Sequence, residues 1–407
     1  MAATPNWPLP DLTILDEVEG ELGARLLMDL YNVRLFAETP ADQRSGLFVP
    51  HARAAWPVPD APGPVLEGVM LLSRLVNDPA GVSSYDLARV CRAIAEWAEN
   101  HSLPVTSVAY AEVAAHLLPS DPEMANLAGR ACRRAAERQR AELWYERGAG
   151  LARRAGNALE QVNGLLGFGN LYRDHGDLGR AFIWIRRAGR TARRNGLRES
   201  AGEALHDAFF LSYLSENLRR AAVWAERAAK IYPVHAARFP YFAADLCLLL
   251  GRYGFYTEAV TILREVQVHL RAPVEQLQLW AILAWVSGGA QDRATYERAL
   301  ARVQELVDHL PYASAAALAY GAAGAQHLGE WALAEQLIGE SRARPQNALA
   351  ARLADRVHAD VSTRSPGVVR PGDEDPGLRA LLATTAYVVQ RLKRWRGATW
   401  RPRRAAQ

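Results

Sequence analysis

The chain has 407 residues, half of them apolar, and a formal net charge of +4, so it has ample material for a core and global disorder is excluded. It contains 73 alanines, and alanine has the highest helix propensity of all residues, which favours an all-α protein. Only Lys230 and Lys393 are lysines, and neither follows a glycine, which excludes a phosphate-binding P-loop.

The cysteine pattern and the N-terminus bear on the cellular compartment. Cys91, Cys132 and Cys247 are far apart and odd in number, which excludes a disulfide framework and a cysteine-based zinc site and indicates a reducing environment. Residues 1–12 carry no basic side chain, and no apolar stretch is long enough to span a membrane. We therefore expect a cytoplasmic protein without a signal peptide. The excess of arginine over lysine favours a GC-rich, bacterial genome.

The first predicted element is a helix over 12–37, where apolar residues recur at helical spacing. Thr39 and Pro40 mark the start of a short second helix. The segment 56–64 holds four prolines and is excluded from any helix interior, and a further helix is predicted over 65–75. Residues 1–75 form an N-terminal helical segment of unknown role.

From residue 83 onward the helical pattern is dense and repeats itself. In three segments spaced 40 residues apart, an alanine is followed three residues later by a tryptophan. These residues are Ala141 and Trp144, Ala181 and Trp184, and Ala221 and Trp224. One helix pair cannot bury its apolar face alone, so such a repeat predicts neighbouring pairs that stack into a solenoid, with the three tryptophans buried at equivalent sites.

The copy at 162–195 resembles the tetratricopeptide repeat (TPR), a helix pair joined by a Gly-Asp-type turn. The residues at the family's spacing are Gly169, Tyr172, Gly176, Ala181, Ile185 and Ala188. The next copy keeps Ala221, Ala228 and Pro233, and weaker copies carry Gly254 with Ala259, Gly289 with Ala294, and Gly329 with Ala334. The resemblance covers about 122–343, with a period of 35 to 40 residues in place of the usual 34.

We therefore predict an all-α fold with a TPR-like solenoid at 83–361, whose clearest repeats lie at 122–343. The segment 362–377 is rich in proline and glycine and is predicted to be a linker. Residues 378–407 are predicted to form an amphipathic basic helix and a tail. We expect the helix to dock onto the last helices of the array, because the end of a solenoid needs its apolar face covered.

Positive charge is concentrated at the C-terminus, where residues 391–407 carry seven basic side chains and no acid. These are Arg391, Lys393, Arg394, Arg396, Arg401, Arg403 and Arg404. The tail is the part of the chain that a nucleic acid or an anionic membrane would bind. A second basic run, 180–198, holds seven arginines and no acid, and it is either a solvated face or a surface for an acidic neighbour or phosphate.

No arrangement of residues indicates catalysis. Asp174, His175 and Asp177 lie together, but they are typical of a repeat turn in which Gly176 takes the left-handed conformation. His206 and Asp207 are adjacent on a predicted helix, so their side chains point about 100° apart and form no catalytic dyad. The histidines show no metal-binding spacing. We expect no enzyme activity, no cofactor and no metal.

In the resembled family the first helix of each pair lines a concave groove, and this implies a set of partner-binding residues from three repeats. They are Asn126, Arg130, Arg133, Asn163, Asn170, Arg173, His206, Phe210 and Tyr213. Asparagine and arginine suit a peptide backbone and acidic side chains. The family's carboxylate clamp uses a lysine that this chain lacks. The alternative is that these residues are merely solvated.

The leading hypothesis is a non-catalytic, cytoplasmic TPR-like module that binds a protein or peptide partner in its concave groove. Two alternatives stay open. One is a signal-responsive regulator that senses a peptide or a small ligand, and the other is association with nucleic acid through the basic tail.

Overall fold

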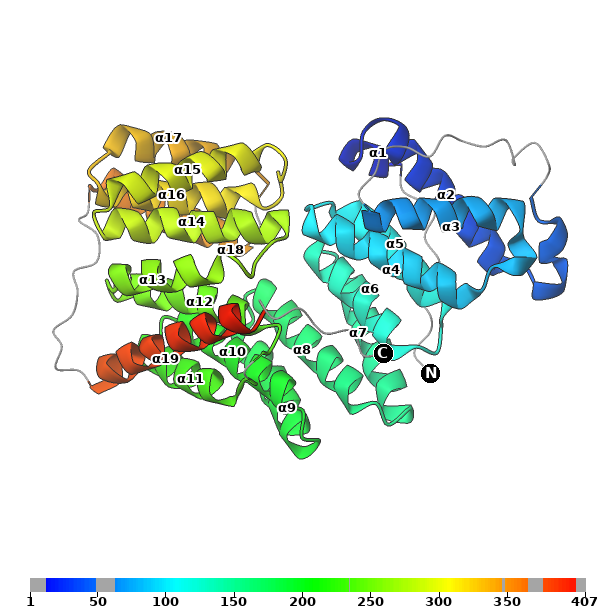
Figure 1. Ribbon diagram of the computed structural model, residues 1–407, viewed down its shortest axis with the longest axis horizontal. Helices are drawn as coiled ribbons and strands as arrows, with labels where there is room; N and C mark the ends of the chain where they lie inside the picture. Colours follow the sequence, from blue (N-terminus) through cyan, green and yellow to red (C-terminus); the bar gives the residue numbers. More distant parts are fainter. Residues whose placement is uncertain (1–11, 49–62, 234, 346–347, 365–375, 400–407) are drawn as a thin grey trace. The chain divides into compact units, whose positions relative to one another are not determined.

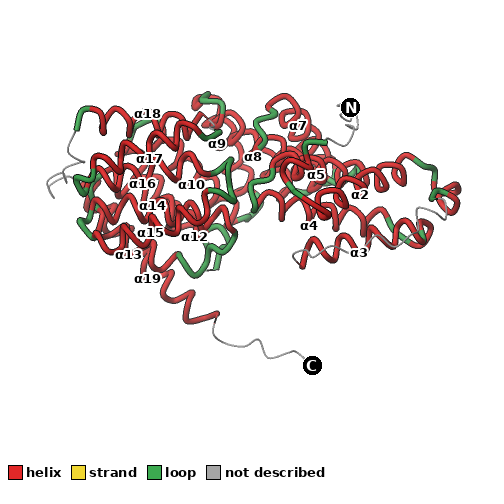
Figure 2. Tube along the Cα trace, turned by 90° about the horizontal axis from the view of Figure 1, so that it is seen from above, coloured by secondary structure: helices red, strands yellow, loops and turns green. Residues whose placement is uncertain are grey.

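The computed structural model describes residues 12–48, 63–233, 235–345, 348–364 and 376–399. Within these residues the chain consists of α-helices, short 3₁₀ helices and turns, and it contains no strand (Figures 1 and 2). The predicted all-α helical-repeat class is confirmed. The chain divides into two compact units, Met1–Leu171 and Tyr172–Gln407.

The first unit holds the N-terminal segment and the first repeats. Its α-helices are α1 Ile14–Glu17, α2 Gly20–Glu38, α3 Gly63–Asn77, α4 Ser84–Asn100, α5 Pro104–Leu117, α6 Pro122–Arg134 and α7 Arg138–Arg154. Helix α8, Ala158–Asp174, contains the boundary between the units. The predicted single helix over 12–37 is wrong, because the backbone is extended at Val18 and Glu19 before α2 begins at Gly20. Gly20 has a φ of +71°, which glycine adopts at little cost.

The break between α1 and α2 gives the N-terminal segment a structural role. The Glu17 carboxylate accepts hydrogen bonds from the backbone N–H groups of Val105 and Thr106, both at 2.8 Å. These N–H groups lie in the first turn of α5 and so have no acceptor within the helix itself. The carboxylate is also a negative charge at the N-terminus of α5, where the helix dipole favours it. One apolar cluster extends from Ile14 to Leu171, so the N-terminal helices share a core with the first repeats.

The second unit continues the helix pairs and ends in two further helices. Its pairs are α9 Leu178–Arg194 after α8, α10 Arg198–Leu214 with α11 Leu218–Ile231, α12 Phe239–Arg252 with α13 Tyr256–Val266, α14 Pro273–Gly289 with α15 Arg293–Val307, and α16 Ser314–His327 with α17 Trp331–Ala343. Helices α18 Ala348–Ser362 and α19 Pro376–Thr399 follow.

The repeats are marked by one left-handed residue in the turn inside each pair. These residues are Ala136, Gly176, Glu216, Gly254, Gln291 and Gly329, and successive members are 40, 40, 38, 37 and 38 residues apart. The predicted period of 35 to 40 residues is therefore confirmed over α6–α17. Ser102 takes the same conformation between α4 and α5, so the pattern already begins at the pair α4–α5.

One copy has a register different from the prediction. The left-handed turn residue is Gln291, with φ +60°, and not Gly289 as predicted. Five residues after this turn residue the other copies over α6–α17 have an alanine, and here the position is occupied by Tyr296. Tyr296 fits because a Cβ on Gly324 of α16 would lie only 2.7 Å from its ring, so glycine leaves the room that the ring needs. The Tyr296 hydroxyl donates to the carbonyl of Gly321 at 3.2 Å. A large residue on α15 is thus matched by a glycine on α16.

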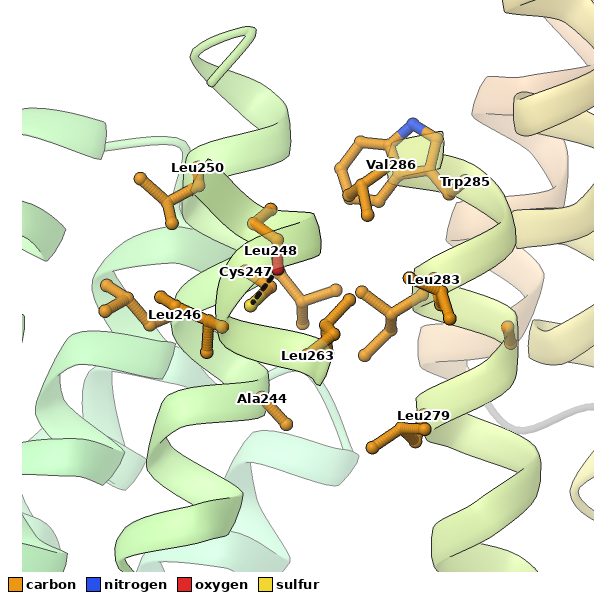
Figure 3. Close-up of a cluster of buried hydrophobic side chains, with 14 of the residues drawn as sticks. Ala244, Leu246, Cys247, Leu248, Leu250, Leu263, Leu279, Leu283, Trp285 and Val286 are labelled. Atoms are coloured by element: carbon orange, nitrogen blue, oxygen red, sulfur yellow. Dashed lines mark hydrogen bonds between the residues drawn. The ribbon is translucent and has the colours of Figure 1, made fainter. Parts of the chain in front are cut away.

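The core of the second unit is well filled between α12, α13 and α14. Figure 3 shows Leu263 and Leu283 meeting in the space between these helices, and both are buried. The thiol of Cys247 donates to the carbonyl of Ala243 at 3.3 Å. Cys132 is likewise buried and outside any disulfide, so both thiols belong to the core.

Helix α19 docks on the array, but not at its end. It packs along α11 and α13, whereas α18 packs against α16 and α17 (Figure 1). The apolar stripe of α19 is buried through Leu378, Leu381, Val388 and Leu392. The expectation that α19 covers the last helices is therefore wrong, because α18 already covers them.

The three tryptophans in register do not share one environment. Trp144 is fully buried, and its Nε1 donates to Glu112 Oε1 at 2.8 Å. Trp184 and Trp224 are only half-buried. The arginines three residues later, Arg187 and Arg227, lie over these two rings at 4.7 and 5.1 Å from the ring centroids.

Candidate peptide-binding channel

The first helices of the last three pairs approach one another closely through glycines. A Cβ on Gly288 of α14 would lie 2.2 Å from the carbonyl oxygen of Gly324 on α16, so only glycine lets these backbones meet. On α12, a Cβ on Gly251 would lie 2.6 Å from the ring of Trp285. The same faces of α12, α14 and α16 are thereby brought side by side.

Five side chains on these faces form what we call the channel lining. They are Tyr213 on α10, Asp245 and Arg252 on α12, Trp285 on α14 and Tyr320 on α16. The rings of Trp285 and Tyr320 stack with their centroids 5.5 Å apart. The charges of Asp245 and Arg252 and the hydroxyl of Tyr213 all influence the pKa of Tyr320, so the five groups share one small region.

The lining is only partly enclosed: Trp285 is buried, whereas the other four side chains are half-buried. Loss of hydration raises the pKa of Tyr320 well above its ordinary value of 10 and that of Tyr213 to about 12. Both side chains nevertheless remain only half-buried. Tyr213 and Tyr320 are therefore partly enclosed by neighbouring helices, with part of each side chain open to solvent.

The channel carries both signs of charge. Asp245 Oδ2 lies 2.8 Å from His206 Nε2, and the Asp245 side chain is 33 % exposed. Arg252 Nη2 lies 3.7 Å from Glu216 Oε1 in the turn after α10. The carboxylate can accept hydrogen bonds from an ammonium or an amide, and the guanidinium can donate to a carboxylate or a carbonyl.

Helix α18 borders the channel next to α16. Its apolar residues Ala354 and Val357 are buried, and α18 packs on α16 and α17. Its polar face reaches back toward the earlier pairs, because Arg356 Nη2 lies 3.8 Å from Glu216 Oε1. The charge of Arg252 also acts on Asp360, a carboxyl whose pKa is raised by burial. The last helix of the array thus lies close to the charged groups of α10 and α12.

Of the five predicted groove residues of the first unit, Asn126 and Arg130 contact a neighbouring repeat, and Asn163 bonds within its own helix. Buried Asn126 donates from Nδ2 to the carbonyl and Oε2 of Glu160, at 2.9 and 2.8 Å, and Asn163 Nδ2 donates to Glu160 Oε1 at 2.8 Å. Arg130 Nε lies 3.1 Å from Glu99 Oε2. Arg133 and Asn170 are half-buried. A role of these residues in partner binding stays a prediction.

The four predicted groove residues of the second unit lie together and adjoin the channel lining. The Arg173 guanidinium lies 5.5 Å from the ring centroid of Phe210, and Phe210 stacks with Tyr213 at 6.0 Å. His206 contacts Asp245 as described, and all four side chains are half-buried. Their contact with a partner is likewise still a prediction.

Four lining residues were missed by the sequence analysis: Asp245, Arg252, Trp285 and Tyr320. The repeat itself offered a signal for two of them. Moving 39 residues forward from His206 and Tyr213 on α10 reaches Asp245 and Arg252 on α12. Trp285 and Tyr320 have no counterpart of this kind, since their positions depend on the glycines that let α12, α14 and α16 approach.

The predicted basic tail is not one exposed surface. Arg391 is buried, with Nη1 donating to the carbonyl of Ala229 at 2.8 Å and Nη2 donating to that of Pro233. Its guanidinium lies 4.0 Å from the ring centroid of Phe239, and burial lowers its pKa. Lys393 and Arg394 are exposed. The side chain of Arg396 and the residues Arg401, Arg403 and Arg404 lie outside the described part of the chain.

The segment from Asp174 to Asp177 forms the predicted repeat turn. Gly176 has φ +79°, and Asp177 Oδ1 accepts the N–H of Arg180 at 3.0 Å, as the predicted repeat turn requires. Among the described residues, no three His, Cys, Asp or Glu side chains are grouped so as to hold a metal ion. None of the described helices combines the length and apolar character needed to cross a bilayer.

No protein-family model matches the sequence, and no curated protein matches it. The fold is similar to a solved structure described as "Rap protein complexed with competence and sporulation factor", with a TM-score of 0.51 and 11 % sequence identity. The match covers 84 % of this chain and 99 % of that one. At this identity the likeness concerns the fold alone, and together with the helix pairs it shows that the chain has a TPR-like helical-repeat fold.

Proposed function

We propose that this chain is a non-catalytic TPR protein that binds an extended peptide segment, free or part of a partner protein, in the channel of the second unit. The observation that carries the proposal is the channel lining, in which the half-buried side chains of Tyr213, Asp245, Arg252 and Tyr320 combine aromatic and charged groups on the first helices of neighbouring pairs. The solved structure with a similar fold is itself a complex with competence and sporulation factor.

The chemistry of the lining suggests which peptide would bind. The exposed part of Tyr320, which stacks on the buried ring of Trp285, offers a flat apolar surface for an aromatic or aliphatic side chain. Asp245 and Arg252 lie on one helix, two turns apart, and suit a basic and an acidic group of the same ligand. The ligand we infer is a short peptide that carries an apolar residue between groups of opposite charge.

Three free, buried thiols support a reducing compartment for this module, and we propose the cytoplasm. The alternative of a regulator that senses a peptide is compatible with the same site, because such a regulator must also bind its peptide.

The test is a peptide array probed with the full chain, followed by titration of the best peptides. Wild type is expected to select peptides with the stated charge pattern. Asp245→Asn and Arg252→Gln should each weaken binding at least about tenfold, the effect of losing one charge-assisted contact. Arg298→Gln on the outer face of α15 is the matched control and should leave affinity unchanged. Equal affinity of all four proteins, or no selection among peptides, would refute the channel as the site.

A further inference from the structure

The outer helices of the second unit differ sharply in charge. They are the second helices of its pairs, together with α19. Helices α13, α15 and α17 carry two acidic residues each, mixed with arginines. Helices α9, α11 and α19 together contain one acid, Glu226, and its Oε1 is bonded to Lys230. The imbalance is therefore confined to three helices.

These three helices are neighbours. The rings of Phe182 on α9 and Trp224 on α11 meet at 6.2 Å between centroids, and Arg220 on α11 lies over Phe182 at 4.6 Å. On the other side of α11, Arg391 of α19 donates to the carbonyl of Ala229 at 2.8 Å. The excess of positive charge thus extends over three neighbouring helices, where Glu226 on α11 and Asp177 before α9 pair with Lys230 and Arg180.

The cations on this surface point the same way because they repeat with the array. Positions 40 residues apart are equivalent in α9 and α11, and three of them carry cations on both helices. These pairs are Arg180 with Arg220, Arg187 with Arg227, and Arg190 with Lys230, all exposed. Lys393 and Arg394 on α19 are exposed beside the end of α11 that Arg391 caps.

Helix stability does not account for these charges. Cations in the last turn of a helix favour the negative end of its dipole, which suffices for Arg193 and Arg194. Arg186, Arg187 and Arg190 lie in the middle of α9, where this effect has faded. They share one exposed face and, in the described part of α9, have no acidic residue on the same helix.

The chemistry of the surface distinguishes between possible partners. A protein interface or a membrane-bound face needs a sizeable apolar core, but large exposed apolar residues are limited here to Ile183, Val223 and Tyr387, one on each of the three helices, among their described residues. Protein–nucleic acid interfaces are polar and strongly positive, and guanidinium groups donate bidentate hydrogen bonds to phosphate. We propose that the outer face of α9, α11 and α19 binds the phosphate backbone of double-stranded nucleic acid.

The experiment measures binding of the full chain to a fluorescent 24-base-pair DNA duplex and to an RNA duplex of equal length, at several salt concentrations. The log of the affinity should fall with the log of salt by about 0.9 for each DNA phosphate neutralised. The triple variant Arg186→Gln, Arg187→Gln, Arg190→Gln should weaken binding at least about tenfold and reduce that slope by about 2 to 3. The two duplexes show whether the backbone of DNA, of RNA or of both is accepted.

The matched control removes three exposed arginines from mixed-charge helices of the same unit: Arg298→Gln, Arg302→Gln and Arg342→Gln. It has the same net charge as the test variant and should change affinity less than about twofold. A second variant, Lys393→Gln with Arg394→Gln, should lose part of the affinity if α19 belongs to the surface. The proposal is overturned if wild type binds neither duplex at 50 mM salt, if both triple variants lose affinity equally, or if phosphatidylserine vesicles are bound and nucleic acid is not.

Discussion

Glu203 on α10 is an acidic side chain whose surroundings disfavour its charge. Burial raises its pKa from 4.5 to about 7, and Arg238, with Nε at 3.8 Å, only partly offsets this. Between these two pH values the folded chain keeps a proton that the unfolded chain has lost. The contribution of Glu203 to the free energy of unfolding is therefore fully present below about pH 4.5, and it is lost as the pH rises through 7.

The change Glu203→Gln removes this titration. We expect the variant to be more stable than wild type at pH 8, by up to about 3 kcal/mol, and the difference to shrink toward pH 5. Urea denaturation at pH 5, 6.5 and 8 measures it. A difference that is the same at all three pH values would show that Glu203 acts through packing and not through its charge.

The half-burial of Trp184 gives a second prediction at the residue scale. Trp144→Ala should lower the free energy of unfolding by about 3–5 kcal/mol, since a fully buried ring and its bond to Glu112 are lost. Trp184→Ala, at a half-exposed site, should cost about 1 kcal/mol. Chemical denaturation of both variants checks the ranking, and equal losses would contradict the difference in environment.

At the scale of elements, the glycine contacts between helices hold the array in its register. A Cβ on Gly324 would lie 2.6 Å from the carbonyl oxygen of Ala284 and 2.7 Å from the ring of Tyr296. Gly324→Ala should therefore destabilise the chain by about 1–3 kcal/mol through overpacking. Gly339→Ala on α17 is the control, because nothing lies within 4 Å of its Cβ position. This control should stabilise by up to about 1 kcal/mol, and thermal melts of both variants give the comparison.

The docking of α19 makes a further prediction for an element. Deleting 376–407 removes a buried apolar stripe and the cap that Arg391 forms on α11, so the melting temperature should fall. Deleting 400–407 alone should leave it unchanged, because α19 stays intact. Arg391→Gln should lose about 1.5–3 kcal/mol, the value of hydrogen bonds from a charged group. An unchanged melting temperature after the longer deletion would show that α19 does not stabilise the array.

The elements also show what a sequence can and cannot predict. The repeat period was predictable, because each turn repeats a local pattern of small and left-handed residues such as Gly176 and Ala181. The break between α1 and α2 and the register of α15 were not, since each depends on local backbone angles or on a glycine in the next helix. The site of α19 was unpredictable for a different reason, because α11 and α13 lie more than a hundred residues earlier in the chain.

At the scale of the whole molecule, burial is unevenly distributed along the chain. In the second unit α14 is buried along most of its length, from Leu277 to Gly288, whereas α9 and α11 expose a full face. Backbone hydrogen bonds in α14 should therefore open only with global unfolding of that unit. Hydrogen–deuterium exchange followed by mass spectrometry should find the slowest amides in α12 and α14. Faster exchange there than in α9 would contradict this picture of the core.

The contact of α19 with helices much earlier in the sequence also affects the newly synthesised chain. Arg391 closes onto Ala229 across 162 residues of intervening sequence. At a synthesis rate of about 5–20 residues per second, roughly 10 to 30 s pass between the emergence of α11 from the ribosome and the arrival of its cover. During that interval the surfaces of α11 and α13 that α19 will cover are exposed, which makes the nascent array a target for chaperones that recognise hydrophobic surface.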